Sequence, residues 1–248
     1  MAGETIGRKN VSFKEAVAYA NARNIVLPDI YYGKLVGIQR SQAVSVAGLG
    51  SLEQIKFVLD KLDTVLKKGQ TFKDFQDAVK ANKLGIDLPR HRLDNIFRTN
   101  IQASYARGRW DQQSRVSGTR PYLMYDAIND GRTRPHHQAM DNTILPRDDP
   151  WWKTHYPPNG YRCRCTVISL TEAQVSKRGG VSGLGPEVDA DEGWEYNPGE
   201  EYEAGAQRGL SKFTLKGREG RVSAAKTRIQ EAADRAKADR RGAPERKS

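Results

Sequence analysis

Residues 130–166 read DGRTRPHHQAMDNTILPRDDPWWKTHYPPNGYRCRCT. This stretch holds both cysteines of the chain and three of its four histidines. Proline recurs along it, and because proline lacks a backbone N–H and fixes φ, long helices and central strands are disfavoured. We therefore expect the stretch to be held together by a metal ion, by a packed aromatic cluster, or by both.

Cys163, Cys165 and His137 are the first candidates for such a metal site. Thiolate and imidazole groups are the usual ligands of structural zinc, and residues i and i+2 of a strand face the same side. If residues 163–170 form a strand, both sulfurs can approach one zinc ion. The candidates for a fourth ligand are His155, His136, Asp130 and a water molecule. The alternative is that both cysteines pack as small buried apolar residues without a metal.

The polar residues that precede His137 support two interpretations. A histidine near the carboxylate of Asp130 can act as a general base, and Arg132 with Arg134 can hold a phosphate group, as a metal-dependent nuclease would require. In the other interpretation, which we favour, Asp130 and Gly131 form a turn whose carboxylate accepts backbone N–H groups and whose arginines form salt bridges. The sequence has neither a nucleophile elbow nor a glycine-rich phosphate loop. We predict that the chain is not an enzyme.

Trp151, Trp152, Tyr156 and Tyr161 place a cluster of rings in the second half of the stretch. We expect most of these rings to cover one end of a small sheet, because large exposed aromatic patches are uncommon on monomeric proteins. The alternative is an exposed patch that binds another protein.

Helical patterns precede the stretch. Residues 51–68 have an apolar stripe of helical period, with Ser51 and Gln54 as a capping box and Gly69 where a C-cap glycine belongs. Pro89 begins the longest predicted helix, residues 90–115. The residues of its expected buried stripe are Leu93, Ile96, Phe97, Ile101 and Tyr105.

Strand patterns flank the same stretch, at residues 121–128 and 163–170, and a short strand at 143–145 is a further candidate. Together these patterns predict an α+β fold, with an N-terminal helical part, a small antiparallel sheet with long loops, and a flexible basic C-terminal tail. The expected divisions are a helical extension (1–50), a main domain (51–175), a linker (176–210) and a basic tail (211–248).

Positive charge is concentrated at the C-terminal end. Residues 211–248 contain 12 Lys or Arg residues against five Asp or Glu, so they supply +7 of the net charge of +11. Such a segment favours a polyanionic partner, above all double-stranded DNA, although a solvated tail without a partner is the alternative. The DNA-binding candidates are Arg218, Arg221, Lys226, Arg228, Arg235, Lys237, Arg240 and Arg241. No run of about 18 apolar residues is present, so we expect no membrane span.

Three motifs occur in a fixed order: D-x-R-T-R-P-x-H at residues 130–137, DDPWW at 148–152 and PPNGYRCRC at 157–165. In this order they resemble the phage Mu F-like minor head proteins, also called phage head morphogenesis proteins. The resemblance extends from about Ser51 to Thr171, and GWEYNPG at 193–199 also resembles a phrase that follows this domain. The motif residues that it marks as a site are Asp130, Arg132, Thr133, Arg134, His137, Asp149, Trp151, Pro158 and Arg164.

The resemblance implies a virion component that is made in the bacterial cytoplasm and incorporated into the phage head. It implies partners among the portal, capsid and scaffold proteins, contact with packaged DNA, and a role in head assembly and at genome ejection. No enzymatic activity is implied for the domain, and zinc is the only cofactor expected. The alternative function is a metal-dependent nuclease or toxin-like effector delivered with phage DNA.

Overall fold

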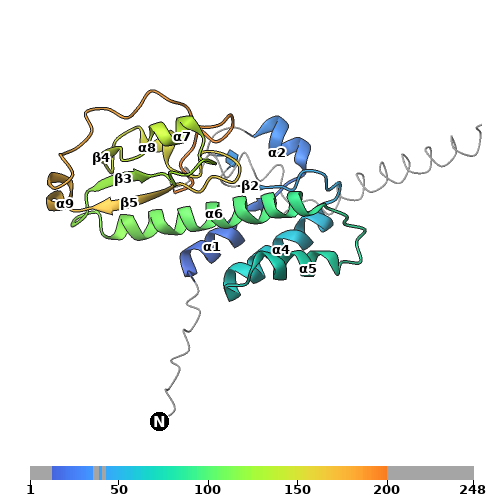
Figure 1. Cartoon of the computed structure of the whole chain (residues 1–248). Helices are drawn as coiled ribbons and strands as arrows, with labels where there is room; N and C mark the ends of the chain where they lie inside the picture. The colour runs from blue at the N-terminus through green and yellow to red at the C-terminus, as the bar shows by residue number, and fades with distance from the viewer. Residues whose placement is uncertain (1–12, 36–38, 41–42, 200–248) are drawn as a thin grey trace, which may run out of the picture.

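The structure is a computed structural model that describes residues 13–35, 39–40 and 43–199, and it has the expected α+β class. The elements are α1 (Lys14–Ala22), β1 (Asn24–Ile25), α2 (Pro28–Lys34), β2 (Ala43–Val44), α4 (Leu52–Lys68), α5 (Phe72–Lys80), α6 (Arg90–Arg115), β3 (Tyr122–Asp126), α7 (Pro135–Ala139), β4 (Ile144–Pro146), α8 (Trp152–His155), β5 (Thr166–Leu170) and α9 (Glu172–Ser176). Figure 1 shows α6 as a long helix that separates the sheet and its loops from α1, α4 and α5.

Strand β3 is the centre of an antiparallel sheet with the order β4-β3-β5, and β1 and β2 form a separate parallel pair. Met124 of β3 lies opposite Ile144 of β4 and Ile168 of β5. The expectation of a strand from residue 163 is wrong, because β5 begins at Thr166. The chain turns before that point, and Arg162 takes a left-handed φ of 59°.

The ends of α4 show how local chemistry sets the helix. Ser51 caps its first turn by accepting a hydrogen bond from the backbone N–H of Gln54 at 3.1 Å, and Gly69 closes the other end with a φ of 62°. Only half of the expected capping box forms, because the Gln54 side chain donates instead to the carbonyl of Leu84 at 3.0 Å. That bond ties the start of α4 to the segment that follows α5.

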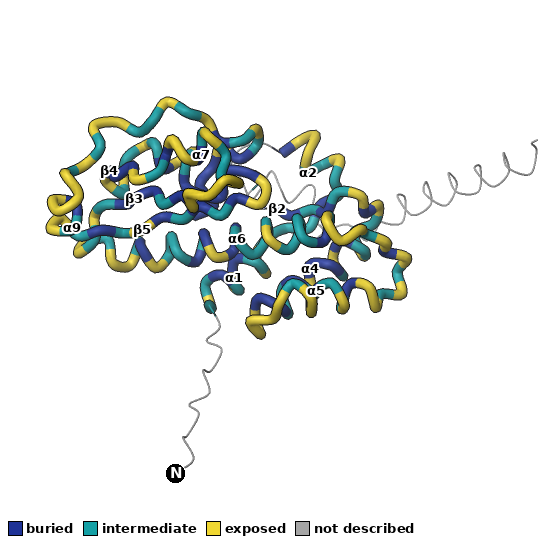
Figure 2. The backbone as a smooth tube through the Cα atoms, in the orientation of Figure 1, coloured by how far each residue is buried: buried dark blue, intermediate teal, exposed yellow. Residues whose placement is uncertain are grey.

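Two apolar clusters lie on opposite sides of α6. One joins α4, α5 and the first turns of α6, and the other joins the sheet, Met140 after α7, α8 and the later turns of α6. Leu93 belongs to the first cluster and Ala106 to the second. In Figure 2 buried backbone is concentrated where the sheet, α7 and the neighbouring loops meet above α6. Helix α6 is thus a shared wall between a helical half and a sheet half.

The buried stripe of α6 differs from the expected one beyond its first turns. Tyr105 is 38% exposed, whereas Ala103 and Ala106 are buried. Ala106 packs in the sheet-side cluster, whereas Gly108 faces α1 so closely that a Cβ there would collide with Phe13 and with the backbone of Ala16. Small residues on α6 allow this contact, so the apolar periodicity of the larger side chains does not mark the packed face.

Residues 181–199 have little regular structure, as expected of a linker, but their C-terminal part is packed against the domain. Ala190, Trp194, Tyr196 and Asn197 are all buried. Residues 190–199, which fall within the expected linker (176–210), are thus packed against the domain, and we call them the strap. No helix in the described ranges is long and apolar enough to cross a membrane.

Candidate metal site

The D-x-R-T-R motif forms a turn that is joined by hydrogen bonds to the loop that carries Cys163 and Cys165, here called the cysteine loop. The carboxylate of Asp130 accepts the backbone N–H of Arg132 at 3.0 Å and both guanidinium N–H arms of Arg164, at 2.7 and 2.5 Å. The hydrogen bonds from Arg164, followed by the backbone bond from Arg132, hold the pKa of Asp130 well below its usual range. Because Arg164 stands between Cys163 and Cys165, this fork fixes the position of the loop that carries both thiols.

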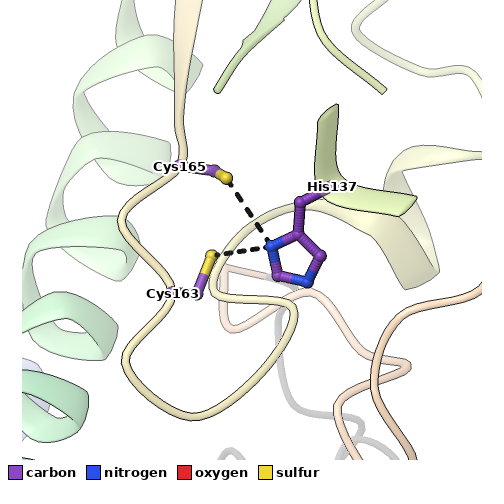
Figure 3. Close-up of side chains that lie close together, drawn as sticks. All are labelled: His137, Cys163 and Cys165. Carbon is purple, nitrogen blue, oxygen red and sulfur yellow. Dashed lines mark hydrogen bonds between the residues drawn. The ribbon is translucent and has the colours of Figure 1, made fainter. Parts of the chain in front are cut away.

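His137, Cys163 and Cys165 converge in the interior, as Figure 3 shows. The Nδ1 atom of His137, on α7, lies 3.7 Å from each of the two Sγ atoms. All three side chains are buried, with exposed fractions of 2% for His137, 4% for Cys163 and 2% for Cys165. The expected proximity of these side chains is therefore confirmed, although the turn before β5, and not the strand itself, presents the sulfurs.

The three donor atoms fit a zinc ion. Zinc bonds of about 2.3 Å to sulfur and 2.0–2.1 Å to nitrogen, at tetrahedral angles, place the S and N atoms roughly 3.6 Å apart. The observed 3.7 Å matches that separation, and all three ligand atoms lie within 4.8 Å of one another. All three residues are among those that line a cavity of about 20 Å³. A space of this size suits one ion or one water molecule.

The two thiols are electrostatically unequal. A hydrogen bond from Cys163, together with one from His137, lowers the pKa of Cys165. The hydrogen bond to Cys165 raises the pKa of Cys163, and burial raises it further. One thiolate at this point is the species that a soft cation would bind.

The protein candidates for a fourth ligand are occupied elsewhere. His155 directs Nε2 to the carbonyl of Val188 at 2.7 Å and Nδ1 to the carbonyl of Trp151 at 3.0 Å. The Nε2 atom of His136 lies 2.9 Å from Asp191, and Asp130 is held by Arg164. Among these candidates, only water remains available for the fourth position.

Asp191, on the strap, is a site residue that the sequence did not reveal. Its carboxylate pairs with His136 at 2.9 Å and with Arg134 at 3.4 Å, and it lies 3.9 Å from Nε2 of His137. That Nε2 atom is buried and has no hydrogen-bond partner in the described chain. Metal-bound histidines commonly direct the second ring nitrogen toward a carboxylate, and Asp191 occupies that position.

The PPNG motif explains how the strap reaches the site. The backbone carbonyl of Asn159 accepts the N–H of Asp191 at 2.9 Å, and a Cβ on Gly160 would collide with the Asp191 carboxylate. Asn159 is itself fully buried and accepts the hydroxyl of Tyr125 at 2.9 Å, while Pro158 is buried beside it. The PPNG motif therefore leaves space for the Asp191 carboxylate and binds its backbone N–H. The only feature of the sequence that could have indicated a role for Asp191 is its closeness to the GWEYNPG motif.

Residues of the DDPWW motif and of α6 form the surroundings of the site. Asp149 accepts the backbone N–H of Trp151 at 2.8 Å, and the Trp151 ring stacks on His155 with centroids 4.4 Å apart. Trp152 is 1% exposed, which agrees with the expected covering role of the rings. On α6, Gln102 donates to the carbonyl of Cys165 at 2.8 Å. Tyr161 differs from the others, because its ring is 39% exposed.

The eight DNA-binding candidates between Arg218 and Arg241 lie outside the described residues.

The remaining motif residue, Thr133, donates its backbone N–H to the carbonyl of Asp130 at 3.0 Å. It therefore belongs to the same turn as Arg132.

Comparison of the sequence with known proteins identifies the family to which this region is similar. Residues 56–168 match the model of the phage Mu protein F like proteins. The chain is 31% identical over 238 aligned residues to protein F of Escherichia phage Mu, which is named as a capsid assembly protein, covering 75% of this chain and 54% of that one. It is 40% identical over 132 residues to the Mu-like prophage FluMu F protein of Haemophilus influenzae, covering 53% of this chain and 30% of that one. No solved structure matches. The chain thus spans about half or less of the length of these relatives, and the region of residues 56–168 belongs to the phage Mu F-like family.

Proposed function

We propose that the chain is a minor head protein that acts by binding during phage head morphogenesis and becomes part of the virion. The observation that carries the proposal is the family match over the region that contains the site, together with a phage Mu relative named for capsid assembly. We retain the divisions at residues 50, 175 and 210 as part of this proposal, with residues 190–199 docked on the domain.

The partners that we propose are the portal, capsid or scaffold proteins of the same phage. The sheet half supports this role, because a loop-built surface held by many side-chain cross-links presents a rigid shape to a partner. Co-expression with the portal protein should give a complex that survives purification. If the portal protein purifies alone while a capsid or scaffold protein co-purifies with this chain, the partner is the capsid or scaffold protein and not the portal.

We infer that His137, Cys163 and Cys165 hold a zinc ion with a water molecule in the fourth position. The donor set, the 3.7 Å spacings and the cavity of about 20 Å³ support this inference. The ion would cross-link α7 to the cysteine loop. Metal analysis of the purified chain should find one zinc per molecule, and Cys163→Ser should remove it. His91→Ala, a substitution of an exposed histidine on α6, is the matched control.

We also propose that the tail beyond residue 210 binds double-stranded DNA and contributes to genome ejection. Its share of the net charge supports this. Replacing the eight tail candidates with glutamine should weaken DNA binding strongly and flatten its salt dependence, since each phosphate contact contributes about −0.9 to the log–log slope. Lys67→Gln with Lys153→Gln is the control. Equal losses in the two variants would contradict the proposal.

One observation favours the rival function of a metal-dependent nuclease or toxin-like effector. Arg132, Arg134, Arg162 and Arg164 line the same small cavity as the metal ligands, and arginines bind phosphate. A catalytic zinc must present its open position to the substrate, however, and the side chains of His137, Cys163 and Cys165 are only 2–4% exposed, which disfavours that access. DNA or RNA cleavage that is lost on His137→Ala would establish the rival. We expect no cleavage above background.

A further inference from the structure

A second cavity, of about 390 Å³, lies between α1, α2, β2, α6 and the strap. Its volume falls within the range of about 300–1,000 Å³ that is usual for small-molecule sites. Arg23, Arg40 and Arg92 line it, and none of the described residues that line it is acidic. Three guanidinium groups around one hollow create a positive potential that favours an anion.

Within the described residues, the side-chain hydrogen bonds of these arginines go to uncharged acceptors. Arg40 donates to the carbonyls of Leu35 at 2.8 Å and Gly193 at 3.3 Å. Arg23 donates to the side-chain oxygen of Asn100 at 2.9 Å, and Arg92 donates to the carbonyl of Ala47. All of these acceptors are neutral amide oxygens. Within the described ranges, none of the three arginines has an ion-pair partner.

Two polar atoms of the cavity residues have no hydrogen-bond partner among the residues that the structure describes. The Nε atom of Arg23 and the Oγ atom of Ser45 are buried and make no hydrogen bond to the described chain. A buried donor without a partner costs about 1–3 kcal/mol, and a ligand oxygen in the cavity would satisfy it. Arg40 lies close to Gly193, whose φ is 80°. A Cβ at position 193 would collide with the Arg40 guanidinium, so the glycine leaves the space that Arg40 occupies.

Aromatic rings accompany the arginines. Tyr32 and Tyr161 line the cavity and are 40% and 39% exposed, so their rings are accessible to a ligand. Trp194 packs against Tyr161 with centroids 5.0 Å apart and holds that ring in place. Guanidinium groups beside exposed aromatic rings are the combination that binds a phosphate and stacks a base.

We propose that this cavity binds one nucleotide unit, with its phosphate at Arg23 and Arg92 and its base against Tyr32 or Tyr161. The same chemistry has two sources, a free nucleotide or the end of a nucleic-acid strand. The proposal uses none of the metal ligands and none of the tail candidates, so its failure would leave the minor head function intact.

Isothermal titration of the full chain tests the proposal with thymidine 5′-monophosphate and with 5′-phosphorylated tetrathymidylate. Arg23→Gln should weaken binding about tenfold or more, as expected for the loss of a charge-assisted hydrogen bond. Tyr161→Ala should weaken it about tenfold through lost stacking. This second variant removes an exposed ring, so it keeps the test valid if Arg23→Gln fails to fold. Arg178→Gln, an exposed arginine outside the cavity, should leave binding unchanged.

The outcomes separate the sources and the alternatives. Equal affinity for the two probes supports a free nucleotide, and tighter binding of the tetranucleotide that is lost on Tyr161→Ala supports a strand end. Inorganic phosphate that binds as tightly as the mononucleotide would overturn the proposal, as would equal losses in Arg23→Gln and Arg178→Gln. Preferential binding of the peptide Glu-Glu-Tyr-Glu, the sequence of residues 200–203, would also overturn it, because the cavity would then suit an acidic peptide.

Discussion

The helical half and the sheet half of the molecule are stabilised by different means. In α4 and α5 the buried residues are aliphatic or aromatic and recur with the helical period, and all but Leu66 belong to one apolar cluster. In the region from β3 to the strap, regular elements are short, and side chains far apart in the sequence cross-link the loops. Asp130 with Arg164 and His136 with Asp191 are two of these links. The helical half therefore relies on apolar burial, whereas the sheet half combines its own apolar cluster with polar links between loops.

Metal removal should give the largest loss of stability, and this loss should be confined to the sheet half. Apparent binding free energies of structural zinc reach about 10–16 kcal/mol in zinc-finger peptides, more than a single packing substitution costs. A chelator, or Cys163→Ser with Cys165→Ser, should therefore expose the amides of the cysteine loop, α7 and the strap to hydrogen exchange. Amides of α4 and α5 should keep most of their protection.

Uniform loss of protection across both halves would contradict this difference and would indicate a single cooperative unit. His91→Ala serves again as the control, because this exposed histidine lies on α6 outside the metal site. Unchanged exchange in both halves after chelation would mean that the two cysteines act only as small buried residues.

Phe75→Ala tests the helical half. Phe75 is fully buried on α5, so truncation should cost about 3–5 kcal/mol of unfolding free energy through lost transfer energy and the cavity left behind. Phe72, one turn earlier and only half-buried, provides the matched control and should cost clearly less. Both values come from urea titration of the zinc-loaded chain. Zinc content should stay unchanged in both variants, and a loss of zinc in Phe75→Ala would show that the halves are coupled.

The fold could be predicted from the sequence where local signals determine it. Ser51, Gly69 and Pro89 mark helix ends by cap chemistry and missing N–H groups, and the structure confirms α4 and α6 at those bounds. The α6 stripe was harder to predict, because Gly108 packs closely against α1 and, like the buried Ala103, carries little apolar signal. Propensity and period describe a helix, but they do not identify a partner that packs against its small residues.

The candidate site could be predicted only in part. Cysteine and histidine chemistry identified His137, Cys163 and Cys165, whose convergence the structure confirms. Asp191 could not be predicted, because nothing local links it to His136, 55 residues earlier in the chain. Its place depends on the absence of a side chain at Gly160. A polar contact between two irregular segments has no period in the sequence, so only the three-dimensional structure reveals it.

Asp191→Asn should loosen the strap without unfolding the domain. The substitution removes the charge that pairs with His136 and Arg134 in a partly exposed position, so we expect a loss of about 1–2 kcal/mol. Limited proteolysis should then cut within residues 185–199 faster than in the wild type. Asp189→Asn, an exposed neighbour, is the control. Equal cleavage rates in the two variants would exclude Asp191 as the anchor of the strap.

Asp130→Asn should give the smallest effect, and its pH dependence identifies the cause. The Asp130–Arg164 pair is exposed to solvent, so it contributes little stability compared with buried contacts. Because Arg164 lowers the pKa of Asp130 in the folded state, the stabilisation is complete above the ordinary aspartate pKa of about 3.9. It is lost as the pH falls below that value toward the lowered pKa. The difference in unfolding free energy between wild type and Asp130→Asn should therefore be constant from pH 7 to about 5 and should shrink below about pH 4. Asp148→Asn, at an exposed position in the DDPWW motif, is the control. A difference that persists undiminished at about pH 2 would mean that the Asp130 turn acts through the shape of its backbone, not through the ion pair with Arg164.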